Sequence, residues 1–320
     1  MVAQPERLTL PTRLETKVSI NLALDPQMFY ATSSVYELPD IVASLGYDWM
    51  ELSPKADLIP FFKYPRIDDA GVQKLRKLAS DAGVGIASLL PVLRWSGPDE
   101  DQRQAAVRAW KRAIQISVDL GVDVMNSEFN GRPEAPETAE AQFLKSMDEL
   151  LPLFEREGVQ LILEPHPDDF IEDGLEAVNM IRGLNKDWIG FLYCTPHAFH
   201  QGHDAATIID AAAEKVRYVH LADAWNHLTS NGLRYITNPP GNTLRVHQHM
   251  EMGRGEVDYD AVFAALASVG FDGVISSCVF GWEEDARGVS ERQRDKALAL
   301  IGKHFGGKTG SAVRSPKIAS

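Results

Sequence analysis

Short apolar runs alternate along the chain with longer segments whose apolar residues recur at helical spacing. The runs predict eight buried strands, and each is followed by a segment that predicts a helix. The predicted strands cover residues 18–24, 49–53, 85–92, 122–129, 158–166, 188–194, 216–223 and 273–279. The predicted helices cover residues 35–45, 69–82, 99–120, 139–157, 174–184, 204–215, 258–269 and 290–305.

This alternation predicts an α/β protein with a parallel sheet, because strand–helix–strand units connect through right-handed crossovers. Eight units without a break in composition favour a single closed (β/α)8 TIM barrel over an open sheet. An open nucleotide-binding sheet needs a glycine-rich loop after its first strand, and NLALDPQMF is not such a loop. We expect an N-terminal arm at residues 1–16, the barrel at 17–305 and a flexible C-terminal tail at 306–320.

Composition and charge narrow the classes of protein. A hydrophobic content of 44% and a charged content of 24% are typical of a soluble globular protein, and no apolar run reaches the roughly 20 residues of a membrane span. Two cysteines and an N-terminus without an apolar signal core predict a cytoplasmic protein without a disulfide framework. The net charge of −13 disfavours nucleic acid as a partner, since phosphate binding usually needs a basic face.

Ionisable side chains stand where the predicted strands end. Residues 158–166 (GVQLILEPH) are apolar until they finish in Glu164 and His166, and active sites of barrels form at such strand ends. The other candidates at strand ends or in the irregular stretch 224–255 are Glu51, Asn126, Glu128, Cys194, His197, His220, Asp223, His247, His249 and Cys278. Eight of the nine histidines lie between positions 166 and 249. Loop histidines scattered by chance would not cluster in this way, so we predict one functional site.

The residue types at these strand ends indicate a metal. A carboxylate with several imidazoles suits a borderline divalent ion such as Mn²⁺, Zn²⁺ or Co²⁺. Such an ion stabilises an enediolate while a neighbouring base moves a proton beside a carbonyl. Glu164 and His166 are two residues apart on a strand, so they point to the same face, roughly 6–7 Å apart. One can hold the metal while His166 acts as the base, a role that suits an imidazole.

Four segments carry a resemblance to a known family: LILEPHP, CTPHAFHQG, YVHLAD and MGRGEVDYDAVF. Their order and spacing resemble the xylose isomerase-like barrel superfamily, which includes sugar phosphate isomerases and epimerases, inosose dehydratases and apurinic endonucleases. The resemblance implies a metal held by Glu, Asp, His and Glu from strands five to eight. Glu164 and His220 match the first and third of these ligands, whereas Cys194 and Cys278 stand in place of the other two.

The two cysteines leave three interpretations of the metal site. In the first, which we favour, a divalent metal, preferably Mn²⁺, is held by Glu164 and His220 together with two histidines that resemble extra ligands of the endonuclease branch, His197 and His249. The cysteines are then small apolar residues. In the second, the cysteines bind as thiolates, which favours zinc. In the third, the site has lost its metal.

The stretches NSEFNGRPE and LEPHPDDFIEDG also resemble the α subunit of bacterial C-glycoside deglycosidases. This resemblance implies that His166 removes the proton at C2 of a 3-keto C-glycoside, after which β-elimination breaks the bond from C1 to the aglycone. It also implies a small β subunit as a partner.

We therefore expect a lyase or isomerase that acts on a carbohydrate derivative. The sharpest version cleaves a 3-keto C-glycoside, and the alternatives within the class are a keto-sugar isomerase or epimerase and an inosose-type dehydratase. A DNA-repair endonuclease and a metal-free binding subunit are alternatives of another class. The residues expected to bind a small-molecule sugar or glycoside are Asn126, Glu128, Arg132, His247 and Asp223.

Overall fold

Eight parallel strands form a closed barrel in the computed structural model, which describes residues 20–202, 204–225 and 248–306. The strands follow one another around the barrel in chain order, and the last strand pairs with the first. They are β1 Asn21–Leu24, β2 Trp49–Leu52, β3 Gly85–Leu89, β4 Val124–Glu128, β5 Gln160–Glu164, β6 Ile189–Cys194, β7 Val216–Leu221 and β8 Val274–Ser277. The prediction of a single TIM barrel is confirmed.

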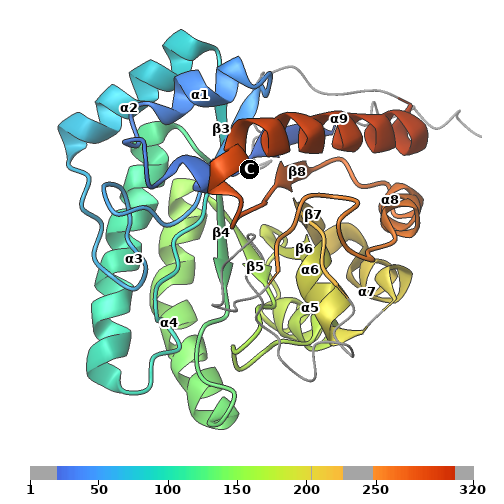
Figure 1. The fold of residues 1–320 in the computed structure, drawn as a ribbon. Coiled ribbons are helices and arrows are strands. Elements are labelled where there is room, and N and C mark those ends of the chain that lie inside the picture. Colours follow the sequence, from blue (N-terminus) through green and yellow to red (C-terminus); the bar gives the residue numbers. More distant parts are fainter. Residues whose placement is uncertain (1–19, 203, 226–247, 307–320) are drawn as a thin grey trace, which may run out of the picture.

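Helices cover the outside of the barrel (Figure 1), and the long helices α3 and α4 lie side by side. The helices are α1 Leu38–Ser44, α2 Asp69–Ala82, α3 Glu100–Leu120, α4 Pro136–Glu157, α5 Gly174–Gly183, α6 Thr195–Gln201, α7 Ala205–Ala212, α8 Tyr259–Ser268 and α9 Ala286–Phe305. Local signals set many of their ends. The Asp99 side chain accepts a hydrogen bond from Gln102 N at the start of α3, and Gly121 ends that helix at φ +77°.

Several element boundaries differ from the prediction for physical reasons. α1 begins at Leu38 rather than at 35, because Pro39 lacks an N–H and fits only the first turn of a helix. β3 ends at Leu89, before Pro91, which has no N–H to give to a strand ladder. Residues 195–201, for which no helix was predicted, form the short helix α6, and Thr195 Oγ1 donates a 2.6 Å hydrogen bond to Ala222 O, directly after β7.

Aromatic side chains fill the space between α3, α4 and the barrel. The indoles of Trp95 and Trp110 stack with centroids 4.2 Å apart, and Phe143 meets Trp95 edge-on at 5.6 Å. Trp95 Nε1 also donates to Phe129 O at 2.9 Å, and Ser96 Oγ donates to the same oxygen at 2.6 Å. This packing fixes the chain just after β4, where part of the site lies.

The expected arm at 1–16 and most of the expected tail at 306–320 lie outside the described residues, so the domain boundaries stay predictions. Within the part of the chain that the structure describes, no helix is long and apolar enough to cross a membrane.

Candidate metal centre and substrate pocket

Five of the predicted residues meet at the carboxyl ends of β5, β6 and β7. We call this group the histidine cluster; its members are Glu164, Cys194, His197, His220 and His249, and each is at most 3% exposed. Glu164 and Cys194 are the last residues of β5 and β6, and His197 lies in the first turn of α6. The convergence expected from the strand ends is therefore present in the fold.

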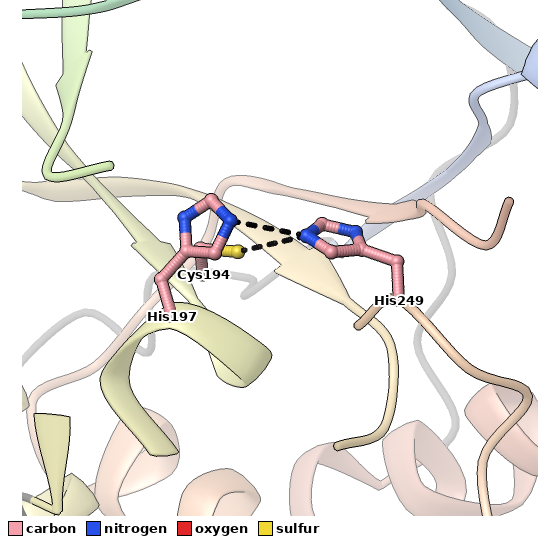
Figure 2. A group of neighbouring side chains, drawn as sticks. All are labelled: Cys194, His197 and His249. Atoms are coloured by element: carbon pink, nitrogen blue, oxygen red, sulfur yellow. Dashed lines mark hydrogen bonds between the residues drawn. The ribbon is translucent and has the colours of Figure 1, made fainter. Parts of the chain in front are cut away.

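Three members of the histidine cluster point their donor atoms at one another (Figure 2). His249 Nδ1 lies 2.7 Å from the carbonyl oxygen of Cys278; a carbonyl only accepts, so Nδ1 carries the proton and Nε2 the lone pair. That Nε2 lies 3.1 Å from His197 Nε2 and 3.7 Å from Cys194 Sγ. A tetrahedral zinc with ordinary bond lengths separates two nitrogens by about 3.3 Å and a nitrogen from a sulfur by about 3.6 Å. The donor spacing therefore fits a metal bound by two imidazoles and a thiolate.

The electrostatic surroundings favour neutral imidazoles in this group. Burial lowers the pKa of His197 to about 4. Burial, with the neighbouring His197, lowers the pKa of His249 well below its usual value. Neutral imidazole is the form that binds a metal. Burial and the charge of Glu164 raise the pKa of the Cys194 thiol, so the thiolate needs a cation beside it.

His220 lies between two buried carboxylates. Its Nδ1 is 3.1 Å from Glu164 Oε1, and its Nε2 is 3.1 Å from Glu51 Oε2. Burial alone would lower the pKa of His220, but the two carboxylates outweigh it and raise that pKa well above its usual value. Two buried carboxylates are stable here only if a positive charge lies beside them. Either a protonated His220 or a divalent cation can supply that charge. The residues present fit a metal on this ground as well.

Glu51 was a strand-end candidate that the sequence did not assign to the metal. It is completely buried in β2, on a strand that is not a neighbour of β7 in the barrel. Asn126 Nδ2 donates to Glu51 Oε1 at 2.7 Å and to Ser88 Oγ at 3.2 Å. Asn126, expected to bind sugar hydroxyls, therefore lies in the interior of the barrel, where it orients Glu51.

A cavity of about 680 Å³, which we call the substrate pocket, opens beside the histidine cluster over the ends of β3, β4 and β5. Its size is within the range of small-molecule sites. Glu128, Arg132 and His166, all predicted for the site, line it together with Arg94 and Asp169, which the sequence did not single out. Asp169 follows His166 closely in LEPHPDDF, and its carboxylate accepts from Asn130 N at 2.7 Å.

His166 connects the substrate pocket with the histidine cluster. Its Nδ1 lies 2.7 Å from Pro167 O, which makes Nδ1 the donor and leaves Nε2 as the proton-accepting nitrogen. Nε2 faces Glu128 Oε1 at 3.7 Å, and the ring meets that of His197 edge-on with centroids 4.7 Å apart. Burial raises the pKa of Glu128; His166 opposes the rise, and Glu164 adds to it. A proton-accepting imidazole thus faces a carboxyl that tends to keep its proton.

Three other predicted residues lie elsewhere. Asp223 is buried, and its Oδ1 and Oδ2 accept from Val257 N at 3.1 Å and from Gly253 N at 2.7 Å. Its carboxylate is thus engaged in shaping the turn after β7, and we propose no substrate contact for it. Cys278 Sγ lies 3.8 Å from Asp25 Oδ2, and Cys278 belongs to none of the metal-type donor groups found among the described residues. His247 lies outside the described residues.

The fold and this site define the chain as a TIM barrel with a metal-type donor set and a pocket at the carboxyl ends of its strands. The family described as xylose isomerase-like TIM barrel matches residues 39–296, so the chain belongs to that family.

Known relatives are distant in sequence. The chain is 20% identical to an inosose isomerase of Bacillus licheniformis over 267 residues, which is 81% of this chain and 90% of that protein. It is 22% identical to a 3-dehydroshikimate dehydratase of Pseudomonas putida over 75% of this chain and 35% of that protein. The structure of an IOLI protein with a bound zinc atom superposes with a TM-score of 0.71 at 17% identity, over 89% of this chain and 99% of the other. A D-psicose 3-epimerase superposes with a TM-score of 0.67 at 16% identity, over 90% of this chain and 100% of the other.

Proposed function

We propose that this protein moves or removes a proton beside the carbonyl of a polyhydroxylated keto compound, as a keto-sugar or keto-inositol isomerase, epimerase or dehydratase. The family, the inosose isomerases and dehydratases among the relatives, and the sugar epimerases with the same fold support this class. They support it better than the cleavage of a 3-keto C-glycoside, which shares only the first proton transfer. A β subunit, a DNA-repair activity and a cytoplasmic location receive no support and are not part of the proposal.

The observation that carries the proposal is the position of His166. Its ring touches both the substrate pocket and the histidine cluster, and its Nε2 is the accepting nitrogen. A carbonyl compound in the pocket would present its acidic C–H to this nitrogen. Glu128, 3.7 Å from His166 Nε2, tends to hold a proton and can give it back to carbon in an isomerisation or to a departing hydroxyl in a dehydration.

The histidine cluster would hold a divalent metal. The donor spacing around His249 supports the second interpretation for one of the two cysteines: Cys194 would bind as a thiolate with His197 and His249, and zinc would be preferred to manganese. The metal would withdraw charge from the carbonyl and lower the cost of the enolate. Glu164 orients His197 and His220 through contacts of 3.1 Å to each, so it sets the geometry of the whole group.

The deciding experiment follows exchange of substrate protons with deuterated solvent. The metal-loaded protein is mixed with keto-inositols and keto-hexoses, and deuterium at the carbon next to the carbonyl is measured by NMR. We expect exchange with at least one compound, and a loss of about 10²–10⁴-fold in His166→Ala. Elemental analysis should find the metal content of that variant unchanged.

The matched control is His304→Gln, because His304 lies on α9 and contacts Asp260 far from the cluster. This variant should exchange at the normal rate. Exchange in His166→Ala within tenfold of the unchanged protein would remove His166 as the base. A metal-loaded protein that exchanges none of the compounds would overturn the proposed class of reaction.

A further inference from the structure

Side chains of both charges line the substrate pocket. Glu128 and Asp169 line it together with His166 and Asp168, and these groups suit hydroxyls and a carbonyl. Arg94 and Arg132 line the same pocket, although the chain as a whole has a net charge of −13. Two guanidinium groups in one pocket of an acidic protein indicate a negatively charged ligand.

Arg94 is held over the pocket by an aromatic ring. Its guanidinium carbon lies 4.2 Å from the centroid of the Phe62 ring, and the Phe62 side chain is 47% exposed. Stacking on a ring orients the planar guanidinium and leaves its N–H edge available. Among the described residues, no carboxylate forms an ion pair with Arg94, which lines the pocket.

Arg132 follows a turn with a fixed shape. Asn130 and Gly131 adopt φ values of +56° and +96°, and a Cβ at Gly131 would come within 2.7 Å of the Ala139 Cβ. Only glycine permits this close approach of the turn to α4. Asp169 holds the same turn by accepting from Asn130 N, and a Cβ at Gly131 would also come within 3.0 Å of the Ser96 Cβ, so the chain next to Arg132 lies close to the chain that follows Arg94.

The first turn of α4 adds positive potential to the same pocket. Thr138 and Ala139 line the pocket, and the N-cap residue of this 22-residue helix is Ala135, which makes no side-chain cap. The N-termini of α2 and α3, in contrast, are capped by Asp68 and Asp99. An uncapped N-terminus favours an anion, although Glu137 in the first turn offsets part of this effect.

We propose that the part of the pocket formed by Arg94, Arg132 and the first turn of α4 binds an anionic group of the substrate. The group is a carboxylate or a phosphate, which both match the fork of a guanidinium. A keto compound bound in this way would place its neutral, hydroxylated end against His166 and Glu128. The inference deepens the proposed function, because it assigns a polyhydroxylated keto acid or keto-sugar phosphate as the substrate class.

The test measures anion binding and not turnover. Inorganic phosphate and D-gluconate are titrated into the full chain by calorimetry at low ionic strength. We expect at least one to bind, about fivefold more weakly in Arg94→Gln or Arg132→Gln and about twentyfold more weakly in the double variant. Binding of gluconate alone indicates a carboxylate substrate, and binding of phosphate alone indicates a phosphorylated one.

The matched control is Arg108→Gln, an exposed arginine of α3 outside the pocket, which should bind like the unchanged protein. Equal weakening in this control would reduce the effect to net charge and overturn the proposal. Binding that persists in the double variant, for instance on a metal ion, would overturn it too, as would no heat with either anion at millimolar concentrations. A chain that binds the anion but exchanges no substrate proton would overturn the proposed function alone.

Discussion

The histidine cluster and the substrate pocket share one rim of the barrel but are built in opposite ways. Every member of the histidine cluster is at most 3% exposed. Contacts of 3.1 Å join Glu164 to His220 and His197, and join His197 to His249. The substrate pocket is lined by exposed arginines, a half-exposed phenylalanine and a loop that follows β4. His166 lies on the border between the two.

The difference separates two tasks. Four of the five side chains of the histidine cluster come from β5, β6, β7 and the first turn of α6, where packing locks their rotamers, and His249 comes from the segment before α8. Most residues that line the substrate pocket come from loops, which can change without disturbing the barrel, although Glu128 is the last residue of β4. A barrel of this kind can thus keep its histidine cluster while the residues that line its substrate pocket change.

The largest effect is expected from Glu164→Gln, which removes a negative charge from the centre of the histidine cluster. Glu164 Oε1 contacts both His197 Nδ1 and His220 Nδ1, and these histidines lower the pKa of the carboxyl well below its usual value against the effect of burial. The neutral amide leaves His220 with one carboxylate instead of two. We expect loss of metal on dialysis and a fall in proton exchange of about 10³-fold. The control is Glu176→Gln, which changes an exposed residue of α5. Full retention of the metal by Glu164→Gln would show that metal binding does not depend on Glu164.

The two cysteines allow a matched comparison within the buried half. Cys194 Sγ lies 3.7 Å from His249 Nε2, whereas Cys278 Sγ lies 3.8 Å from Asp25 Oδ2. Cys194→Ser should weaken zinc binding at least about tenfold, and Cys278→Ser should change it little. Competition with a chromogenic chelator measures both affinities. Equal affinities in both variants would return the site to the first interpretation, with histidine and carboxylate ligands only.

A smaller effect, on the free energy of unfolding, is expected from Glu251. This residue lies in the segment that carries His249 and forms ion pairs with α9. Glu251 accepts from Arg292 Nε at 2.9 Å and from Lys296 Nζ at 3.1 Å, both on α9. Burial alone would raise the pKa of Glu251, but these cations lower it to about 2 from 4.5. We expect Glu251→Gln to lower the free energy of unfolding by about 1–2 kcal/mol at pH 7, after discounting for solvent around the cations.

This contribution should depend on pH in a defined direction. The carboxyl has a lower pKa in the folded than in the unfolded chain, so its stabilisation is complete above pH 4.5 and is lost as the pH falls towards 2. Urea unfolding at pH 7 and at pH 3 should therefore show a difference between Glu251→Gln and the unchanged protein that shrinks at the lower pH. A difference that is constant over this range would mean that packing, and not charge, causes it.

The sequence predicted the barrel and most of the buried half, because strand ends are visible in the hydrophobic pattern and converge in any closed barrel. It did not predict that His220 contacts Glu51, since β2 and β7 are not neighbours and only the closed barrel brings the two residues together. No pattern in the sequence singled out Arg94 as a residue of the site. Its position depends on how Trp95 packs and on the ring of Phe62, which are tertiary facts without a spacing of their own.

The stacked indoles of Trp95 and Trp110 are fully buried, and Trp95 stands in the chain between two residues that line the pocket, Arg94 and Ser96. Rings 4.2 Å apart and inclined by only 9° are close enough for their electronic transitions to couple, so we expect the pair to contribute a signal in circular dichroism. Trp95 Nε1 donates to Phe129 O, immediately before the turn that carries Arg132. A ligand that shifts this turn on binding should therefore also shift Trp95, so we expect the signal of the tryptophan pair to report whether the pocket is occupied.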